Sequence, residues 1–252
     1  MVVIAEVVSV GTELLIGEIQ NSNATFIGRR LAEVGYDAHH QVTVGDNLER
    51  IIDVLRTACD RADVVIVTGG IGPTQDDLTK EAMCELAGVT MSRDSAHASL
   101  IHDRVMERRG VVLDNVLRMA DLPTGAEALP NVNGLALGSA LECRDAWVFV
   151  LPGVPQEMER MLDEQVMPRL EALSGSETLR SMVVRTHGLG ESEVADRLDA
   201  LFASHNPSIA FRIADSEVLV RITAKAASVE VADSMLAEMD AKVRALLHDA
   251  VL

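Results

Sequence analysis

Two spacings of apolar residues alternate along the first two thirds of the chain. Runs of consecutive apolar residues are typical of buried strands, and apolar residues three or four apart are typical of helices that cover a core. The runs predict strands at 2–10, 37–44, 64–68, 126–129, 136–142 and 146–151. The wider spacing predicts helices at 23–33, 48–59, 78–87, 94–109, 115–120 and 155–170. Strands alternating with such helices predict an α/β fold with a parallel sheet covered on both faces.

The pattern changes at residues 172–176, ALSGS, where small and polar residues interrupt the apolar spacing. Beyond this point it predicts strands at 181–186, 208–213 and 218–224, and helices at 192–202 and 229–247. Such a set is a small α+β unit of about the minimum size that encloses its own core. We therefore expect two domains, residues 1–173 and 174–252.

The composition favours a cytoplasmic protein that does not bind nucleic acid or anionic lipid. The 252 residues carry a formal net charge of −17, which repels nucleic acid and anionic lipid, so a phosphate ligand must be captured locally. The acidity is more simply explained as serving solubility or a salty cytoplasm. Cys59, Cys84 and Cys143 form no CxxC pair and are expected to be reduced and buried. The opening run MVVIAEVVSV has no basic leader and predicts a strand, and no apolar run approaches the ~20 residues of a membrane span.

A glycine-rich loop follows the third predicted strand, in the stretch VVIVTGGIGPTQDDLTKEA at 64–82. Gly69, Gly70 and Gly72 lead to a helix start, where backbone N–H groups lack partners and the helix dipole favours an anion. Thr68 and Thr74 would add hydroxyl donors. The loop is neither G-x-x-x-x-G-K-[ST] nor G-x-G-x-x-G. It therefore predicts either a phosphate cradle of another kind or a plain tight turn.

Asp76 and Asp77 stand directly after this loop. One of them is expected to cap the helix at Leu78, since aspartate is a favoured N-cap residue. The other has no such role, and two carboxylates beside a phosphate would repel it unless a cation lay between them. Mg²⁺ is typically held by one or two carboxylates together with substrate phosphates. The pair therefore predicts a divalent metal site, with Mg²⁺ favoured and Mn²⁺ or Co²⁺ as alternatives.

Two more polar loops are expected beside the glycine loop, since ligands collect at the carboxyl ends of parallel strands. Gly11, Thr12 and Glu13 follow the first strand, and Asp46 follows the second. Taken alone, Glu13 also fits a helical turn, and Asp46 fits an N-cap for the helix at Leu48. Their shared position at one sheet edge is what predicts a site.

Four stretches together are similar to one protein family. GTELLIGEIQNSNA at 11–24, VGDN at 44–47, TGGIGPTQDDLT at 68–79 and LPGVPQEM at 151–158 resemble the amino-terminal region of CinA, the competence/damage-inducible protein A family. HGLGESE at 187–193 and VRITAKA at 220–226 extend the resemblance over essentially the whole chain. The family shares its first domain with the molybdopterin-binding proteins MogA, MoaB and MoeA. The resemblance implies a three-layer α/β/α domain with a mostly parallel sheet, then a KH-like α+β unit.

The resemblance also implies an activity, metal-dependent hydrolysis of the pyrophosphate bond of ADP-ribose or a related nucleotide to AMP and ribose 5-phosphate. Asp46 and Asp77 match the aspartates that the family associates with Mg²⁺ and catalysis, and Asp76 is a further candidate metal ligand. Glu13 would contact a ribose hydroxyl or a metal-bound water, and Arg118 would meet the second phosphate. The other residues expected to bind the ligand are Gly11, Thr12, Asn23, Thr68, Gly69, Gly70, Gly72, Pro73, Thr74, Gly138, Pro152 and Gly153.

The sequence departs from the family pattern in two places. Where the family tends to show N-x-x-G-T-A-P-G, residues 131–138 read NVNGLALG, so Leu135 replaces a hydroxyl donor and Leu137 a proline. A usual polar run is here VLRM at 116–119. Both changes make walls of the expected pocket more apolar. They favour an alternative, a non-catalytic, regulatory module that binds a nucleotide or molybdopterin phosphate. A molybdopterin-handling enzyme is a third alternative.

The same resemblance also indicates which binding partners to expect. The family usually continues with a carboxy-terminal nicotinamide-nucleotide deamidase domain, which we expect this chain to lack, so a separately encoded deamidase is a candidate partner. KH recognition of RNA uses a GXXG clamp, and GLGE at 188–191 places an acid in it, so no nucleic-acid partner is expected. Related domains assemble as dimers or trimers, and we expect a homodimer.

Overall fold

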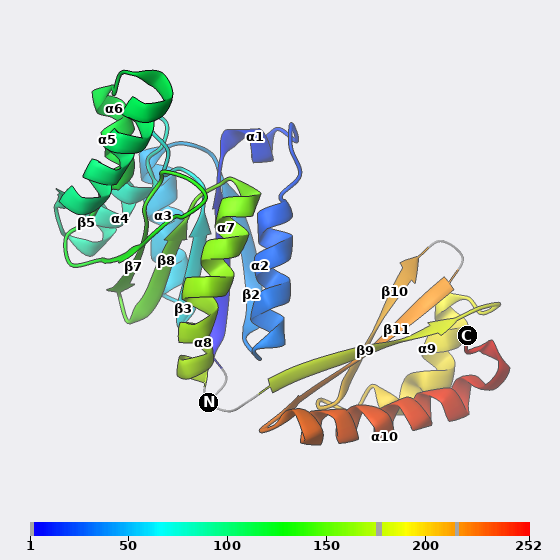
Figure 1. Ribbon diagram of the computed structural model, residues 1–252. Coiled ribbons are helices and arrows are strands. Elements are labelled where there is room, and N and C mark those ends of the chain that lie inside the picture. The colour runs from blue at the N-terminus through cyan, green and yellow to red at the C-terminus, as the bar shows by residue number, and fades with distance from the viewer. Residues whose placement is uncertain (1–2, 175–177, 215–216) are drawn as a thin grey trace. The chain divides into compact units, whose positions relative to one another are not determined.

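The computed structural model describes residues 3–174, 178–214 and 217–252 (Figure 1). The chain forms two compact units, Met1–Ala32 with Tyr36–Leu173 and Glu33–Gly35 with Ser174–Leu252. Gly175 and Ser176, which the predicted boundary includes, lie outside the described residues. Across the described ranges, none of the helices has the length and apolar character that crossing a membrane requires.

A six-stranded sheet of order β2-β1-β3-β8-β7-β6 forms the centre of the first unit. β1, β2, β3 and β8 are parallel, whereas β7 and β6 run antiparallel to their neighbours. All residues of β3 are buried, as expected of a central strand covered on both faces. The mostly parallel sheet confirms the predicted α/β class. The strands are β1 (Ile4–Val10), β2 (Asp37–Val44), β3 (Val64–Thr68), β6 (Glu127–Leu129), β7 (Gly138–Cys143) and β8 (Ala146–Leu151).

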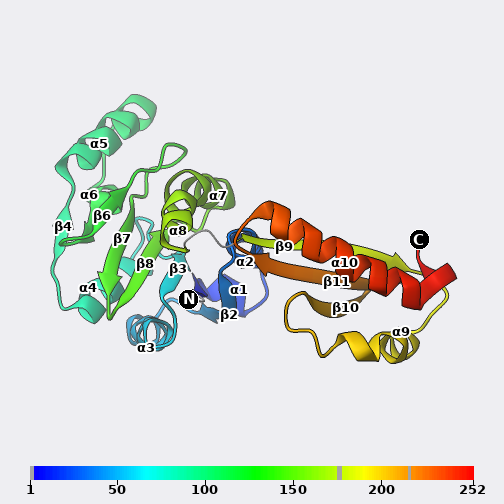
Figure 2. The ribbon, with the colours of Figure 1, turned by 90° about the horizontal axis from the view of Figure 1, so that it is seen from below.

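Helices cover both faces of this sheet. α3 and α4 bury Leu55 and Met83 in the cluster that holds Val8 and Val67. Figure 2 shows α7 and α8 on the other side of the sheet from α3. The helices are α1 (Thr12–Leu15), α2 (Ser22–Glu33), α3 (Leu48–Cys59), α4 (Thr79–Ala87), α5 (Ser95–Arg109), α6 (Asp114–Leu117) with a 3-10 turn (Arg118–Ala120), α7 (Pro155–Met161) with a π-helical segment (Leu162–Val166), and α8 (Met167–Ser174).

Apolar spacing does not predict three of the short elements, β4, β5 and α1. β4 (Met91–Arg93) and β5 (Asp121–Pro123) form a two-stranded antiparallel ladder, which an ion pair between Arg93 and Asp121 closes at 2.6 Å. These strands and α1 have three or four residues each, about one helical turn, so they carry too few positions to show a period. The ends of the other predicted elements differ from the observed ends by a few residues at most. For example, the helix predicted from Leu78 begins at Thr79.

The second unit is α+β, as predicted. Its three-stranded antiparallel sheet has the order β10-β11-β9, and Val184, Val220 and Ile222 pack with Leu236 and Val243 of α10. The predicted helix at 192–202 is shorter and ends in a 3-10 turn. The elements are β9 (Thr178–Thr186), α9 (Glu191–Leu198) with the turn Asp199–Leu201, β10 (Ser208–Ala214), β11 (Glu217–Ala226) and α10 (Val229–Leu247), followed by a 3-10 turn (His248–Ala250).

Four loops of the first unit meet at one edge of its sheet. Val10 at the end of β1 pairs with Val44 at the end of β2, and Thr68 at the end of β3 pairs with Leu151 at the end of β8. Because these strands are parallel, the loops after them begin at the same level. Polar residues far apart in the sequence are thereby brought together, as the loop prediction requires.

Candidate functional site

A cleft of about 640 Å³ opens at this edge of the sheet. Most residues that the sequence predicts for the site line it, and they come from all four loops. The described lining residues include five carboxylates and one guanidinium, so the cleft itself is acidic. The predicted residues found there are Gly11, Glu13, Asp46, Gly69, Gly70, Gly72, Pro73, Thr74, Asp76, Asp77, Pro152 and Gly153.

The glycine loop turns sharply out of β3. Gly69 and Gly70 adopt φ values of 99° and 67°, and a Cβ atom on Gly69 would overlap the carbonyl oxygen of Val10. The Thr79 hydroxyl at the start of α4 donates to the Gly69 carbonyl at 2.8 Å. Within the described residues, the N–H groups of Gly70, Ile71 and Gly72 donate no hydrogen bond. The loop therefore offers consecutive free amides, the feature that a phosphate cradle needs.

Asp77 closes this loop rather than capping α4. Its Oδ2 accepts a hydrogen bond from the Thr74 amide at 2.8 Å and one from the Thr74 hydroxyl at 2.5 Å. Leu78 occupies the N-cap position, and no side chain caps the helix there. The predicted aspartate cap is therefore wrong. A Cβ atom on Gly72 would lie 2.7 Å from Asp77 Oδ2, so the carboxylate would have to shift if this residue carried a side chain.

Asp46 connects the loop after β1 to the loop after β2. Its Oδ2 accepts from the Thr12 amide at 2.8 Å, and its own amide donates to the Thr12 hydroxyl at 3.2 Å. Asn47, not Asp46, caps α3 by accepting from the Arg50 amide at 3.1 Å. The alternative role of Asp46 as an N-cap is therefore wrong. Thr12 supports the cleft through Asp46.

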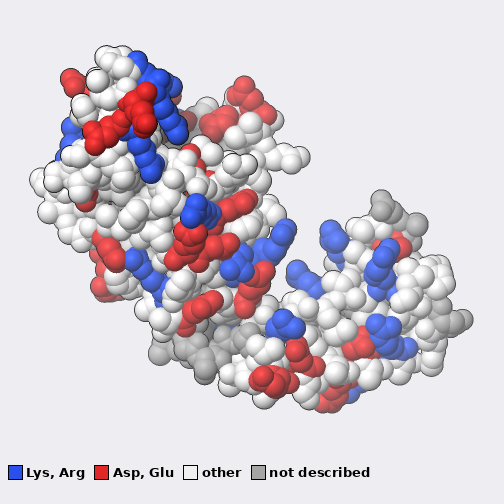
Figure 3. All heavy atoms as spheres, in the orientation of Figure 1, with Lys and Arg blue, Asp and Glu red and all other residues white. Residues whose placement is uncertain are grey.

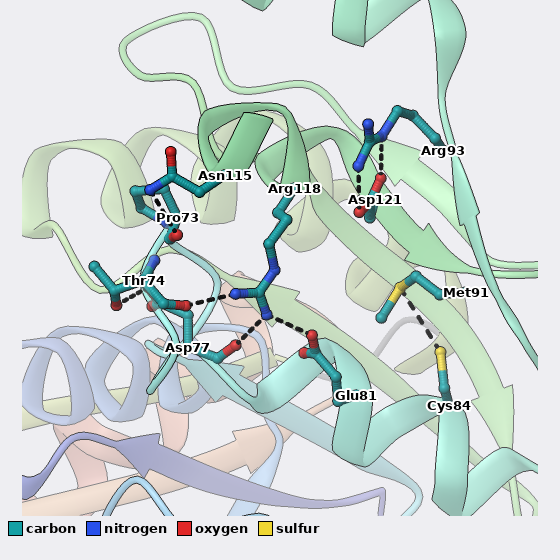
Figure 4. A network of polar contacts seen from close by, with 10 residues as sticks. All are labelled: Pro73, Thr74, Asp77, Glu81, Cys84, Met91, Arg93, Asn115, Arg118 and Asp121. Carbon is teal, nitrogen blue, oxygen red and sulfur yellow. Dashed lines mark hydrogen bonds and ion pairs between the residues drawn. The ribbon is translucent and has the colours of Figure 1, made fainter. Parts of the chain in front are cut away.

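Arg118, Gly138 and Leu137 are among the residues named in the prediction that do not line the cleft. Arg118 donates to the Thr74 carbonyl at 2.8 Å and to Glu81 at 2.7 Å, so it supports the glycine loop from outside (Figure 4). Gly138 lies inside the sheet, where a Cβ atom would be 2.7 Å from the Val150 carbonyl oxygen. Leu137 is buried in the core rather than in a cleft wall. Close packing, not a ligand, accounts for glycine at 138.

Two charged residues in the cleft are absent from the prediction. Glu157 of α7 accepts from Asn131 Nδ2 at 2.6 Å and approaches Gly134 closely. It stands within LPGVPQEM at 151–158, so the motif contains a signal for it. Arg108, near the end of α5, makes no ion pair or hydrogen bond with the residues described, and nothing in its spacing indicates a site. Figure 3 shows basic and acidic side chains intermingled over α5 and α6.

Lys80 is a buried cation behind the glycine loop. Its Nζ donates to the Met119 carbonyl at 3.0 Å, and Met119 lines the cleft. Burial lowers the pKa of Lys80 from 10.5 to about 8, partly offset by the nearby carboxylates of Asp121, Glu81 and Asp77. Lys80 has no ion pair with any residue that the structure describes.

Asn23 and Thr68 lie in a second cavity of about 280 Å³ beside the cleft. The cleft and the second cavity adjoin one another, because they share the lining residues Val10, Glu13, Gly69 and Gly153.

The candidate metal ligands do not form a complete metal site. Among the described residues, no three His, Cys, Asp or Glu side chains group closely enough to hold a metal ion by themselves.

Comparison with known proteins extends over both units. The family described as "Probable molybdopterin binding domain" matches residues 6–172, and the "Damage-inducible protein CinA KH domain" matches residues 181–251. A putative competence-damage inducible protein of Moorella thermoacetica is 41% identical over 98% of this chain, and a CinA-like protein of Kosmotoga olearia is 39% identical over 98%. The chain spans 60% of the length of each.

A solved structure of CinA from Thermoplasma acidophilum, described as having unknown function, superposes with a TM-score of 0.62 at 32% identity. The match covers 68% of this chain and 98% of that one. Three findings agree on the family: the matched family models, the sequence identities and the shared fold. The chain therefore belongs to the CinA family, with a molybdopterin-binding-type domain followed by a CinA KH domain.

Proposed function

We propose that the cleft binds the diphosphate of ADP-ribose or a related nucleotide and hydrolyses it with a divalent metal, giving AMP and ribose 5-phosphate. The observation that carries the proposal is the run of free amides at Gly70–Gly72 in a cleft that also holds Asp46 and Asp77. Free amides bind phosphate oxygens, whereas carboxylates repel them. A site with both suits a phosphate that arrives together with a cation.

The two carboxylates suit a metal ion whose coordination is completed by the bound phosphate. Asp46 and Asp77 each use one oxygen, Oδ2, within the protein, and their Oδ1 atoms accept no hydrogen bond from the described residues. Because no three donors group together, the protein would supply only part of the coordination, as is usual for Mg²⁺ bound with substrate phosphates. When bound, the metal would offset phosphate charge and favour attack by water.

The chain's own residues would then position the diphosphate. The amides of Gly70, Ile71 and Gly72 would hold one phosphate, and the Thr12–Asp46 and Thr74–Asp77 hydrogen bonds would keep both carboxylates in place. The guanidinium of Arg108, which lines the cleft, would bind the second phosphate. Arg118 would act indirectly, by holding the carbonyl of Thr74.

Release of AMP from ADP-ribose by the purified chain tests the proposal, with Mg²⁺, Mn²⁺, Co²⁺ or EDTA present. The proposal predicts release with at least one metal and none with EDTA. Absence of release with every metal would contradict it. The melting temperature is measured in the same samples, because bound ligand stabilises the folded chain whether or not it is turned over.

A non-catalytic module that binds a nucleotide or pterin phosphate is the second candidate function. Leu135 favours it, because this residue lines the cleft where the family tends to have a hydroxyl donor. This candidate predicts a rise in melting temperature with ADP-ribose or a pterin phosphate and no AMP with any metal. Such a module would act with a separately encoded enzyme.

A further inference from the structure

The cleft has an apolar wall in addition to its carboxylates. Met119, Leu135, Ala136 and Val154 line it. The Leu137 amide donates to the Met119 carbonyl at 2.9 Å, which holds Met119 against the loop that joins β6 to β7. Apolar side chains bind neither phosphate nor metal ions, so this wall suits a different part of a ligand.

The loop between β6 and β7 is held in place by α5. Arg104 Nη1 donates to the Gly134 carbonyl at 3.2 Å, and His97 Nε2 donates to the Leu135 carbonyl at 2.9 Å. A carbonyl oxygen only accepts, so the proton of the second hydrogen bond lies on His97 Nε2. The loop is therefore fixed before a ligand arrives, which lowers the entropic cost of binding.

Glu157 of α7 is fixed against the same loop. Its Oε2 accepts from Asn131 Nδ2 at 2.6 Å, and Asn131 is 3% exposed. Asn131 Oδ1 accepts from the amides of Asn133 and Gly134 at 3.2 and 2.8 Å, so the orientation of the Asn131 side chain is determined. A Cβ atom on Gly134 would overlap the Glu157 carboxylate. The carboxylate therefore lies beside the loop at Gly134, one residue before Leu135.

The second carboxylate oxygen of Glu157 is open to a ligand. Oε1 accepts no hydrogen bond from the described residues and is not among their buried unpartnered atoms. Within the described ranges Glu157 forms no ion pair, and it does not group with two further acidic, His or Cys side chains as a metal site requires. A carboxylate only accepts hydrogen bonds, so the partner of Oε1 must bring a donor.

The carboxylate and the apolar wall together suit an aminated heteroaromatic ring. The flat face of such a ring packs on apolar side chains, and one fixed polar group then sets its orientation. A phosphate would be repelled by Glu157. A sugar also brings donors, but some of its hydroxyls would be left against the apolar wall without partners.

We propose that this wall binds an aminated heteroaromatic ring and that Oε1 of Glu157 accepts a hydrogen bond from the exocyclic amino group of the ring. The proposal rests on the proposed function for one point, that the glycine loop holds a phosphate of the same ligand. In ADP-ribose the ring is adenine, and in the second candidate function it is the pterin. The proposal concerns recognition and does not require turnover.

Calorimetric titration in the presence of EDTA tests this assignment with two pairs of ligands. ADP-ribose and its hypoxanthine analogue differ by the exchange of the amino group for an oxygen, and pterin and lumazine differ by the same exchange. The proteins are the wild type, Glu157→Gln and Glu159→Gln. Glu159 also belongs to α7 but lines a separate surface hollow and not the cleft, so its variant controls for the lost charge.

The quantity compared is the ratio of the two dissociation constants within each pair, so a general loss of affinity cancels. We expect the wild type to bind the aminated member of at least one pair about tenfold more tightly, the range of one hydrogen bond with a charged group. In Glu157→Gln the side-chain oxygen stays with Asn131 and the new amide N–H faces the ligand, so the preference should vanish or reverse. Glu159→Gln should keep it.

The pair that shows the preference identifies the ring as adenine or pterin. No preference in either pair, or an unchanged preference in Glu157→Gln, overturns the proposal. Loss of all binding by Glu157→Gln at an unchanged melting temperature overturns it as well, because Glu157 would then act on the ligand as a whole and not on the amino group.

Outcomes for this ring site and for the proposed hydrolysis are separable. A preference for the amino group that depends on Glu157, without AMP release in any metal, would support the ring site and contradict the hydrolase. AMP release by the wild type with an unchanged preference in Glu157→Gln would do the reverse.

Discussion

The Asp77 carboxylate accepts two hydrogen bonds from Thr74, one from the amide at 2.8 Å and one from the hydroxyl at 2.5 Å (Figure 4). The residue proposed to hold the metal therefore also fixes the shape of the glycine loop. Arg118 contacts the carbonyl of the same Thr74 at 2.8 Å. Changes at position 74 should thus affect the loop without removing the carboxylate.

Replacing Thr74 with Val removes the hydroxyl donor and keeps the amide donor. We expect the free energy of unfolding to fall by about 1 kcal/mol, the usual net value of one hydrogen bond. Thr74→Ser keeps the hydroxyl and should lose less than half of that. Urea unfolding measures both. Equal losses for Val and Ser would mean that the hydroxyl bond to Asp77 contributes nothing.

Lys80 should make stability depend on pH in an unusual direction. Its pKa is about 8 in the folded chain and 10.5 when exposed, so between these values the unfolded state binds more protons. Stability should therefore rise as the pH increases from about 8 to 10, by up to about 3 kcal/mol in total. Lys80→Met should remove this rise in urea unfolding at pH 7, 8, 9 and 10. Parallel pH profiles for the two proteins would contradict the burial of a charged Lys80.

Glu6 of β1 is a buried carboxylate that depends on Arg61. It is 1% exposed and accepts from Arg61 at 2.7 and 2.8 Å. Arg61→Met would leave Glu6 with only the His40 ring, 4.0 Å away, as a partner, and we expect a loss of about 2–3 kcal/mol, reduced because Arg61 is partly exposed.

Arg144→Met is the control for this ion pair. Arg144 pairs with Asp60 at 2.7 Å, and both side chains are exposed, so the loss should stay below about 1 kcal/mol. Thermal unfolding at pH 7 compares the two variants. Similar losses would show that burial of Glu6 has no special cost.

Gly138→Ala tests whether this glycine serves packing or a ligand. A Cβ atom there would lie 2.7 Å from both the Val150 carbonyl oxygen and Met161 Cε, so we expect destabilisation of about 1–3 kcal/mol. Affinity for ADP-ribose, corrected for the folded fraction, should not change. A selective loss of affinity in a stable variant would restore the ligand-binding role.

Long periodic segments made most of the fold predictable. The apolar run at β3 and the helical spacing at α3 have the predicted ends, because burial on a sheet or on one helix face imposes a period that the sequence displays. β4 and β5 have no such period, and each is defined by its ladder with the other, in which Arg93 pairs with Asp121 across 28 residues. Their partner, not their composition, determines them.

The loops that form the site were predictable from the sequence, but the structural role of each residue in them was not. Aspartate after a glycine loop fits an N-cap and a loop-closing acceptor equally, and only the position of Thr74 distinguishes them for Asp77. Lys80 and Arg108 carry no local pattern, since their relation to the cleft arises from packing between distant elements. Glu157 could have been found, because it stands in a motif already identified.

AMP release from ADP-ribose with Mg²⁺ by the wild type, Asp77→Asn and Asp53→Asn tests the proposed hydrolysis most directly. Asp53 is an exposed carboxylate of α3 outside the cleft, so its variant controls for the change in net charge. We predict release by the wild type and by Asp53→Asn, and at least about a hundredfold slower release by Asp77→Asn at an unchanged melting temperature. Equal rates for the wild type and Asp77→Asn, or no release by the wild type, would contradict the proposed hydrolysis.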